Sequence, residues 1–430
     1  MSDVVVRSLL RGVVAHVRQV LFVPPRDQLR PLNGLRGLGS IMITSFHCAI
    51  FTGLFPLTTG AKAALNWFQY SINGFWVALD IFFVLSGFLI GRILLTNLVR
   101  HGTLRSRSFY TRRFFRIFPA YYLVLTLGLF WYTRLGLPVV KFIMGDVGSG
   151  WRAVQGGGWK NYVYLSNYLI PPGRPNIMTW GWSLCLEEHF YLMLPPLLWL
   201  IFRCRKTTVR CALLVAAGLL PLVGRAVQYA VNPRIVLMEG FYYYSHNRFD
   251  EVFVGVVIAF FYVVDHARLR AFCERVGHGL WIAAALLIGF VWLYGGLQET
   301  GCFAVVWQFS IMALGAGLLV LNCLFLPNRV TRFFAHGFWY PFARTSYGTY
   351  LIHPFVLLWL VDRFGSTAPT HRIGPGSFVI VYLAVMAITQ LIAFVMFVLL
   401  ERPLIDTGVR LTRERPATLG ERLEPVRMSG

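Results

Sequence analysis

Long apolar runs separated by short polar or basic segments recur along almost the whole chain. A helix needs about 20 mostly apolar residues to cross the hydrocarbon core of a bilayer. On this criterion we predict ten spanning helices, at about 35–55, 74–97, 117–135, 181–202, 211–230, 249–264, 280–295, 303–324, 346–362 and 376–400. The expected fold is all-α: a polytopic membrane helix bundle of about ten transmembrane helices, with residues 31–403 as one transmembrane domain.

The composition supports a membrane protein. Hydrophobic residues make up 57% of the chain, and the mean hydropathy is +0.60. Charged residues make up only 13%, whereas soluble domains carry about 25%. The seven cysteines are scattered without metal-ligand spacing, so we expect apolar core residues and no metal site.

The formal net charge of +22 is unevenly distributed. When termini and loops are assigned to alternate sides of the predicted helices, 29 of the 40 Lys and Arg residues fall on the side of the termini. Because cytoplasmic loops are enriched in basic residues, this predicts that both termini are cytoplasmic. The excess positive charge thus mainly sets the orientation of the chain in the membrane. It has a secondary role toward membrane lipids or other anionic ligands. No nucleic-acid partner is expected.

Three segments differ from the spanning region. Residues 1–30 are basic and are expected to form either a helix on an anionic membrane surface or a poorly ordered tail. Residues 404–430 are rich in Arg, Glu and Pro and are expected to form a disordered cytoplasmic tail. The outer loop at 136–180 is rich in Trp, Tyr and Asn, and it either stacks on sugars or anchors the chain at the interface.

Arg36 and His47 lie eleven residues apart in one apolar run. At about 100° and 1.5 Å per residue, both side chains project from one helix face, about 16 Å apart along the axis. This is half of a hydrocarbon core of about 30 Å, so an arginine at one membrane surface places the histidine near the middle. An ionisable group at that depth is a candidate functional residue.

Two further clusters lie in the first half of the chain. Asp80 stands early in an apolar span and must face protein or water, and Ser86-Gly87 permits close helix packing. Arg113 and Arg116 are helical neighbours at the cytoplasmic start of a span. Their guanidinium groups suit phosphate oxygens, although anchoring at lipid headgroups is the favoured explanation on this segment alone.

The second half carries more acidic residues and a second histidine. Glu187 and Glu188 begin a span from the outer side and point about 100° apart, so they cannot both face one ligand. One is expected to orient a catalytic group while the other pairs with an arginine, for instance Arg248. Asp250 follows in a first helical turn, where the helix dipole favours it. His353 precedes Pro354 and is either a hydrogen-bonded structural residue at a kink or a catalytic one.

Taken together and in this order, these segments resemble acyltransferase family 3, integral membrane O-acyltransferases that include glycan acetylases. The matching segments are Leu-Arg-Gly at 35–37 with His47, Phe-Phe-x-Leu-Ser-Gly-Phe at 82–88, Arg-Arg-x-x-Arg-Ile-x-Pro-x-Tyr-Tyr at 112–122, Trp-Ser-Leu-x-x-Glu-Glu-x-Phe-Tyr-Leu at 182–192, Ser-Tyr through His-Pro at 346–354, and Glu-Arg-Pro at 401–403. The chain has Ala78-Leu79 where members often have Gly-Val. Many relatives carry a C-terminal esterase-like domain that we do not expect here, so we expect that either the spanning region performs the whole transfer or a partner completes it.

The resemblance implies a multi-pass enzyme of the bacterial inner membrane. The expected donor is cytoplasmic acyl-CoA, most often acetyl-CoA, and the expected acceptor is a carbohydrate hydroxyl of a cell-surface or secreted glycan. The sequence leaves the oligomeric state open. The residues assigned to catalysis are His47, Arg36, Glu187 and Glu188. Those assigned to the donor are Arg36, Arg113, Arg116 and Ser86, and those assigned to the acceptor are Asp80, Trp182, Arg248, Asp250 and His353.

Two mechanisms and one competing function remain open. His47 either removes the proton of the acceptor hydroxyl as a general base or forms a covalent acyl intermediate. The competing function is a transporter or flippase for a lipid-linked glycan without acyl chemistry, because buried charges are also natural there. A structural scaffold would leave Arg36 and His47 unexplained.

Overall fold

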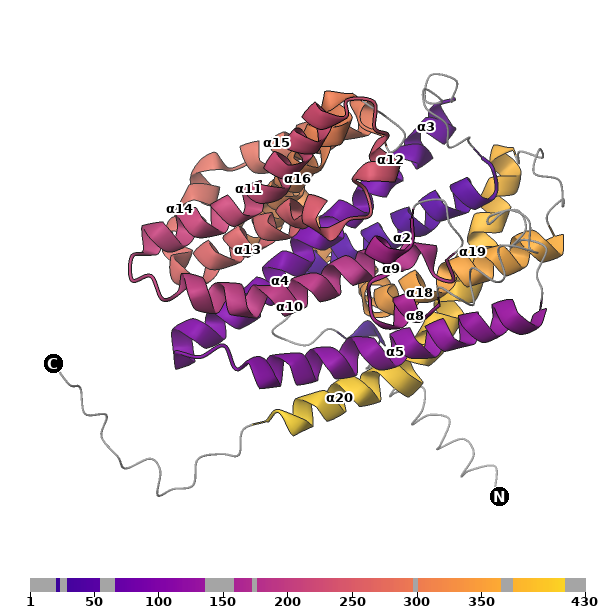
Figure 1. Cartoon of the computed structure of the whole chain (residues 1–430), viewed down its shortest axis with the longest axis horizontal. Helices are drawn as coiled ribbons and strands as arrows, with labels where there is room; N and C mark the ends of the chain where they lie inside the picture. The colour runs from indigo at the N-terminus through magenta and orange to yellow at the C-terminus, as the bar shows by residue number, and fades with distance from the viewer. Residues whose placement is uncertain are drawn as a thin grey trace.

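The computed structural model of the chain describes residues 21–23, 29–54, 66–135, 158–171, 176–296, 301–364 and 374–413. Within these ranges all regular structure is helical (Figure 1). The predicted all-α fold is therefore confirmed.

One long helix overlaps each of the ten ranges predicted from the apolar runs. These helices are α2 (Arg30–Phe51), α4 (Ala78–His101), α5 (Ser106–Leu135), α10 (Trp182–Ile201), α11 (Thr207–Val231), α13 (Phe249–Val264), α15 (Gly279–Tyr294), α16 (Gln308–Phe325), α18 (Trp339–Phe364) and α19 (Pro375–Met396). The shorter α-helices are α3 (Trp67–Asn73), α8 (Trp159–Tyr162), α9 (Ser166–Leu169), α12 (Leu237–Gly240), α14 (His266–Val276), α17 (Arg329–Ala335) and α20 (Arg402–Leu411). The 3₁₀ turns are η2 (Gly74–Val77), η3 (Thr179–Gly181) and η4 (Ser245–Asn247), and the π-helical turns are η5 (Phe303–Trp307) and η6 (Phe397–Glu401).

Among the described residues, seven helical segments are long and apolar enough to cross a membrane. An eighth is reached if α13 and α14, which are bent by 114° relative to each other, count as one broken span. Helix α15 is apolar but shorter than these segments, and α18 buries several polar side chains along its length. The protein is therefore multi-pass, while ten spans and cytoplasmic termini stay predictions.

Several helix boundaries differ from the predicted ones. Helix α5 begins at Ser106 rather than at 117, so the arginines of that segment lie inside the helix and not before it. After α19 the chain continues through η6 into α20 and remains helical to Leu411, beyond the predicted boundary at 403. The rest of the predicted tail, the central part of the outer loop and most of the predicted N-terminal segment lie outside the described residues.

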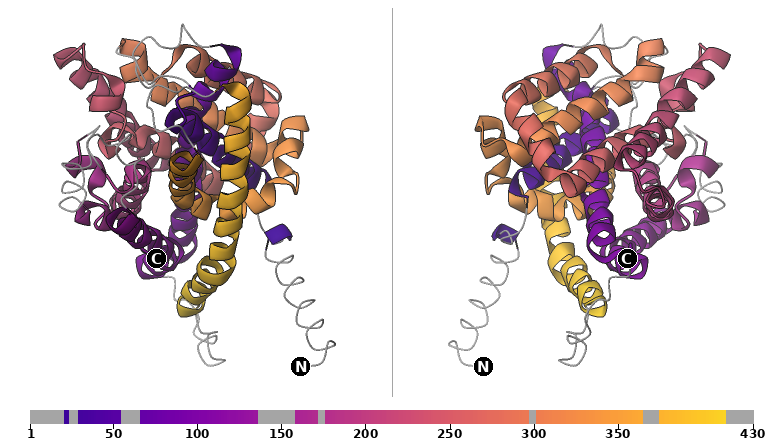
Figure 2. Two further views of the ribbon diagram at one scale, coloured as in Figure 1. Left: turned by 90° about the vertical axis from the view of Figure 1, so that its right-hand side faces the viewer. Right: turned by 90° about the vertical axis from the view of Figure 1, so that its left-hand side faces the viewer.

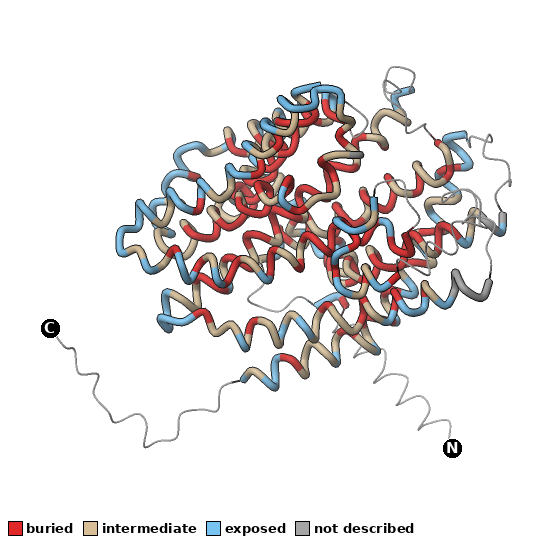
Figure 3. Tube along the Cα trace, in the orientation of Figure 1, coloured by how far each residue is buried: buried red, intermediate tan, exposed pale blue. Residues whose placement is uncertain are grey.

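Helix α2 occupies a central position in the bundle. It packs against α18 on one side and against α4 on another, while α4 is crossed closely by α13 (Figures 1 and 2). Helix α20 packs along α5 at the lower edge of Figure 1. Buried residues concentrate where α2, α4, α10 and α13 come together, and exposed residues concentrate on the outward faces (Figure 3). The central helices therefore carry the polar residues discussed below.

Two glycines allow α4 and α13 to approach each other closely. A Cβ atom added at Gly87 would overlap the backbone carbonyl of Val252, and one added at Gly255 would overlap the backbone of Val84 and Phe88. Small residues at helix contacts let backbones come together in membranes. The close packing predicted for Ser86-Gly87 is confirmed.

This contact predicts that replacing glycine by alanine affects the free energy of unfolding differently at two positions. Gly255→Ala should destabilise the protein by about 1–3 kcal/mol, because the added methyl group forces the two helix backbones apart. Gly224→Ala in α11 is the matched control, since nothing lies within 4 Å of an added Cβ there, and helix propensity favours it by up to about 1 kcal/mol. Thermal unfolding of the two purified variants in detergent measures the difference, and equal midpoints would contradict the contact.

Candidate active site

His47 of α2 and His353 of α18 form the centre of the candidate site. His47 Nδ1 and His353 Nε2 lie 2.7 Å apart, within hydrogen-bonding distance. The two residues are separated by 306 positions in the chain and meet because α2 packs against α18. His353 is fully buried, whereas His47 keeps part of its surface accessible. His47 therefore has an accessible face and a buried partner.

A series of hydrogen bonds surrounds His353, the buried member of this pair. His353 Nδ1 lies 2.8 Å from the backbone carbonyl oxygen of Thr349, one turn earlier in α18. The Thr349 hydroxyl accepts a hydrogen bond from the Gln390 amide of α19, at 3.0 Å, and Thr345 donates to Gln390 Oε1 at 2.8 Å. These contacts tie α18 to α19 beside His353. The structural prediction of a hydrogen-bonded histidine beside Pro354 is confirmed.

Three arginines converge near the start of α2. Arg36 interacts electrostatically with Arg113 and Arg116 of α5, and all three keep part of their surface accessible. Within the described part of the chain none of the three forms a hydrogen bond or an ion pair; Arg113 lies instead against the ring of Tyr191, with its Cζ 5.5 Å from the ring centre. Like charges gathered without a salt bridge are costly unless an anion joins them.

Glu187 and Ser86 border this arginine cluster (Arg36, Arg113 and Arg116). The Tyr191 hydroxyl donates a hydrogen bond to Glu187 Oε2 at 2.9 Å, and Ser86 Oγ lies 3.2 Å from the same hydroxyl. Glu187 also interacts electrostatically with Arg36 and Arg113. The four residues predicted to bind the donor are thus brought together, with Glu187 among them.

Glu188 points to a different side of α10. It is buried, its Oε1 atom has no hydrogen-bond partner among the described residues, and it interacts electrostatically with Tyr121 and Tyr164. Burial raises the pKa of the Tyr164 hydroxyl well above its ordinary value, so this group stays protonated. The divergence of Glu187 and Glu188 is confirmed. Among the described residues neither forms a hydrogen bond with His47, and the expectation that one of them orients a catalytic group stays a prediction.

A second, fully buried network joins α4, α11 and α13. Arg248 pairs with Asp80 and, at 2.7 Å, with Glu251. Arg225 pairs with Asp250 at 2.7 Å. We expected Arg248 to pair with Glu187 or Glu188, but it pairs with neither. Since these side chains have almost no accessible surface, we propose that they fix the packing of the helices rather than contact an acceptor.

Trp182 belongs to the aromatic surroundings of Arg248. Its side chain is buried, and the Arg248 Cζ lies 5.5 Å from its ring centre and 4.9 Å from that of Tyr242. Tyr350 of α18 closes the space toward His353, with its hydroxyl 2.5 Å from Ser183 Oγ. The structure therefore places Trp182 in packing contact with the ion-pair network rather than on an open surface.

Three residues were not singled out in the sequence. Tyr191 links Ser86 to Glu187, and its spacing of four residues from Glu187 on one helix was a usable signal. Arg225 lies within the apolar helix α11, where an arginine is a functional or structural candidate by default. Thr349 acts through its backbone carbonyl, which no sequence pattern marks.

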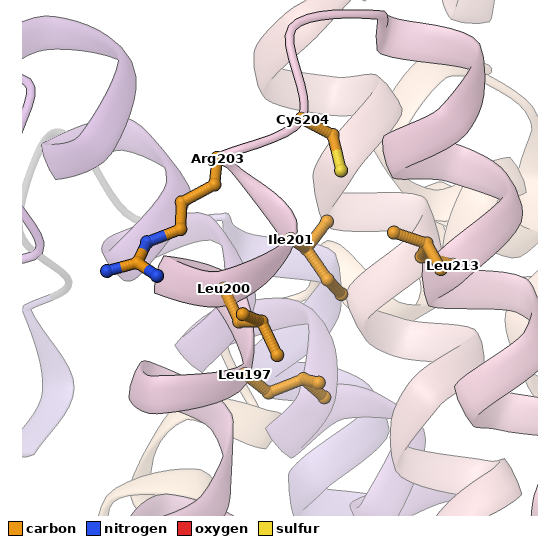
Figure 4. A pocket seen from close by; sticks show the side chains of 6 residues that line it. All are labelled: Leu197, Leu200, Ile201, Arg203, Cys204 and Leu213. Atoms are coloured by element: carbon orange, nitrogen blue, oxygen red, sulfur yellow. The ribbon is translucent and has the colours of Figure 1, made fainter.

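An open groove of about 380 Å³ lies at the other end of α10, between α10 and α11 (Figure 4). Its lining is mostly leucine and isoleucine, with Arg203 and Cys204 at one side. None of the predicted site residues lines this groove. The candidate site is therefore defined by the convergence of polar side chains between α2, α5, α10 and α18.

These features define a polytopic helical membrane protein with a histidine pair and an unpaired arginine cluster at its centre. The family model of an acyltransferase domain matches residues 30–398. The chain belongs to this acyltransferase family, as its motifs suggested.

Several curated proteins are similar in sequence. The peptidoglycan O-acetyltransferase OatA of Listeria monocytogenes is 28% identical over 238 residues, which cover 55% of this chain and 34% of OatA. The putative peptidoglycan O-acetyltransferase YrhL of Bacillus subtilis is 24% identical over 392 residues, 88% of this chain and 55% of YrhL. A putative O-acetyltransferase of Staphylococcus aureus is 22% identical, and the match covers 58% of its length. The matches thus span about a third to three fifths of these relatives, and no solved structure matches significantly.

The buried network predicts a strong effect on stability. Arg248→Gln should destabilise the protein by about 3–5 kcal/mol, because Asp80 and Glu251 are left as buried carboxylates without their cation. Arg270→Gln is the control, since Arg270 and Glu274 form an exposed pair whose loss costs at most about 1 kcal/mol. Unfolding of both variants in detergent tests this, and similar stabilities would show that the network is dispensable.

Proposed function

We propose that this protein transfers an acyl group, most simply acetyl, from acyl-CoA to a hydroxyl of a cell-surface or secreted glycan. Membership of the acyltransferase family and the similarity to proteins named O-acetyltransferases support the reaction class. The observation that carries the proposal is that Arg36, a member of the arginine cluster, and the accessible His47 lie three turns apart on the same helix, α2.

The arginine cluster is suited to the phosphates of the donor. Arg36, Arg113 and Arg116 present guanidinium donors that no carboxylate in the described ranges occupies, and guanidinium groups bind phosphate in a bidentate manner. Ser86 adds a hydroxyl at the edge of the cluster. The long pantetheine arm of CoA separates the phosphates from the thioester, as α2 separates Arg36 from His47 by about 16 Å along its axis.

We assign the role of general base to His47. Its neutral imidazole takes the proton of the acceptor hydroxyl while the oxygen attacks the thioester carbonyl carbon. The C–O bond forms, the C–S bond breaks, and the leaving thiolate of CoA recovers the proton from His47. In α2 this histidine stands four residues before the last residue, Phe51, on the side from which an outer acceptor would arrive. Attack by His47 itself, through an acyl intermediate, is the alternative.

The arrangement agrees with a donor from the cytoplasm. The basic termini and loops predict that the Arg36 end of α2 faces the cytoplasm, where acyl-CoA is made, and a bacterial inner membrane fits a surface glycan as acceptor. Glu188 and Tyr164 have buried oxygens without a hydrogen-bond partner among the described residues, and we assign them to the hydroxyl groups of the acceptor.

Removal of the base should abolish turnover. His47→Gln is expected to lower kcat by about 10²- to 10⁴-fold, the usual contribution of a general base, with the protein still folded. The measurement is the release of free CoA thiol from acetyl-CoA by purified protein with a glycan acceptor. His101→Gln at the exposed end of α4 is the control.

The same assay separates the enzyme from a flippase. A protein that only moves a lipid-linked glycan releases no CoA thiol, with or without His47. Full activity of His47→Gln would also refute the proposed base.

Loss of a donor-binding arginine should act on the donor. Arg36→Gln is expected to raise the KM for acetyl-CoA by about 10- to 100-fold, since a hydrogen bond to a charged group contributes about 1.5–3 kcal/mol. Arg112→Gln on α5 is the matched control, because Arg112 is exposed and donates to Thr412 instead. An equal KM for Arg36→Gln and Arg112→Gln would remove the arginine cluster from donor binding.

A further inference from the structure

We propose that His353 is a positioning residue that fixes the proton of His47 on Nδ1 and leaves the Nε2 lone pair free for the reaction. This inference rests on the proposed function of His47. It assigns the reactive nitrogen of His47 and gives His353 a role other than binding the acceptor.

The two imidazole rings are joined edge to edge by a hydrogen bond and are not stacked face to face. Their planes differ by only 6°, and their centres are 5.0 Å apart. With the two nitrogens 2.7 Å apart, this separation requires both nitrogens to lie near the line that joins the ring centres. A proton between them is therefore held in an almost straight hydrogen bond.

The backbone determines which nitrogen carries the proton. The carbonyl oxygen of Thr349 can only accept, so His353 Nδ1, which lies 2.8 Å away, must be the donor. A neutral imidazole has one N–H and one lone pair, so His353 Nε2 is an acceptor. In the hydrogen bond between the two rings, His47 Nδ1 must then be the donor. The lone pair of the neutral His47 ring is therefore on Nε2.

The opposite assignment is disfavoured by the surroundings. If His353 Nε2 donated to His47, both nitrogens of His353 would carry protons and the ring would be a cation. His353 is fully buried, and among the described residues no carboxylate lies within hydrogen-bonding distance of either ring. An unpaired charge in such a place is costly, so the neutral pair has one favoured arrangement.

The arrangement also prepares His47 for the charged state of the reaction. When Nε2 takes the acceptor proton, His47 becomes an imidazolium whose Nδ1–H already points at a lone pair. A hydrogen bond from a charged donor is roughly twice as strong as a neutral one, so His353 stabilises His47 more in the transition state than in the resting state. His353 itself is fully buried and acts through His47.

Two substitutions separate the hydrogen bond from the volume of the side chain. His353→Gln keeps an acceptor oxygen of similar reach, whereas His353→Met fills a similar volume without a comparable acceptor. We expect His353→Met to lower kcat by about 10- to 100-fold with little change in the KM for acetyl-CoA, and His353→Gln to recover most of the loss. Equal losses in the two folded variants, or no loss in His353→Met, would overturn the proposal.

A spectroscopic measurement tests the proton position in the unaltered protein. In histidine-labelled protein in bilayers, solid-state ¹⁵N NMR distinguishes a protonated from an unprotonated ring nitrogen, and His47→Gln identifies the signals of His47. We expect a protonated Nδ1 and an unprotonated Nε2. A resting His47 with its proton on Nε2 contradicts the proposal even if the His353 variants fail to fold.

The outcomes also distinguish this inference from the proposed function. An active His47→Gln refutes the function of His47, and with it this inference. An inactive His47→Gln together with a fully active His353→Met refutes only the role of His353.

Discussion

Hydrocarbon cannot solvate a charge or an unpaired polar group, and this constraint organises the centre of the molecule. Every buried ionisable side chain must find a partner within the bundle or face a space that water or a ligand can reach. Arg225 and Arg248 take the first course, with three carboxylates around them and almost no accessible surface. The arginine cluster of α2 and α5 takes the second. The difference between the two groups is the clearest guide to function in this chain.

The two polar groups place different demands on the same helices. The ion pairs between α4, α11 and α13 accompany the close crossing at Gly87 and Gly255, so charge pairing and backbone packing stabilise one contact. Helix α4 also carries Ser86 toward Tyr191. The half of the bundle that holds the ion pairs is thereby linked to the half that holds the arginines and histidines, which suits a site that must position two substrates.

The sequence was sufficient for the helices and for part of the site. Apolar runs give the approximate position of each long helix, and a spacing of eleven residues places Arg36 and His47 on one face whatever surrounds them. Partners across helices are different. His47 meets His353 over 306 positions, and Arg248 selects Asp80 and Glu251 rather than Glu187 or Glu188. These choices depend on which helix faces pack together, which is decided by the whole bundle and not by local pattern. Helix ends were also missed, because polar turns such as the start of α5 can remain helical at a membrane surface.

The lack of ion pairs at Arg36, Arg113 and Arg116 among the described residues has a thermodynamic consequence. An arginine cluster without a salt-bridged carboxylate is less stable empty than with an anion bound, and any ligand that binds only the folded state adds to the free energy of unfolding. If acyl-CoA is that ligand, the supply of donor in the cell governs not only the rate of transfer but also how long each copy of the protein survives in the membrane.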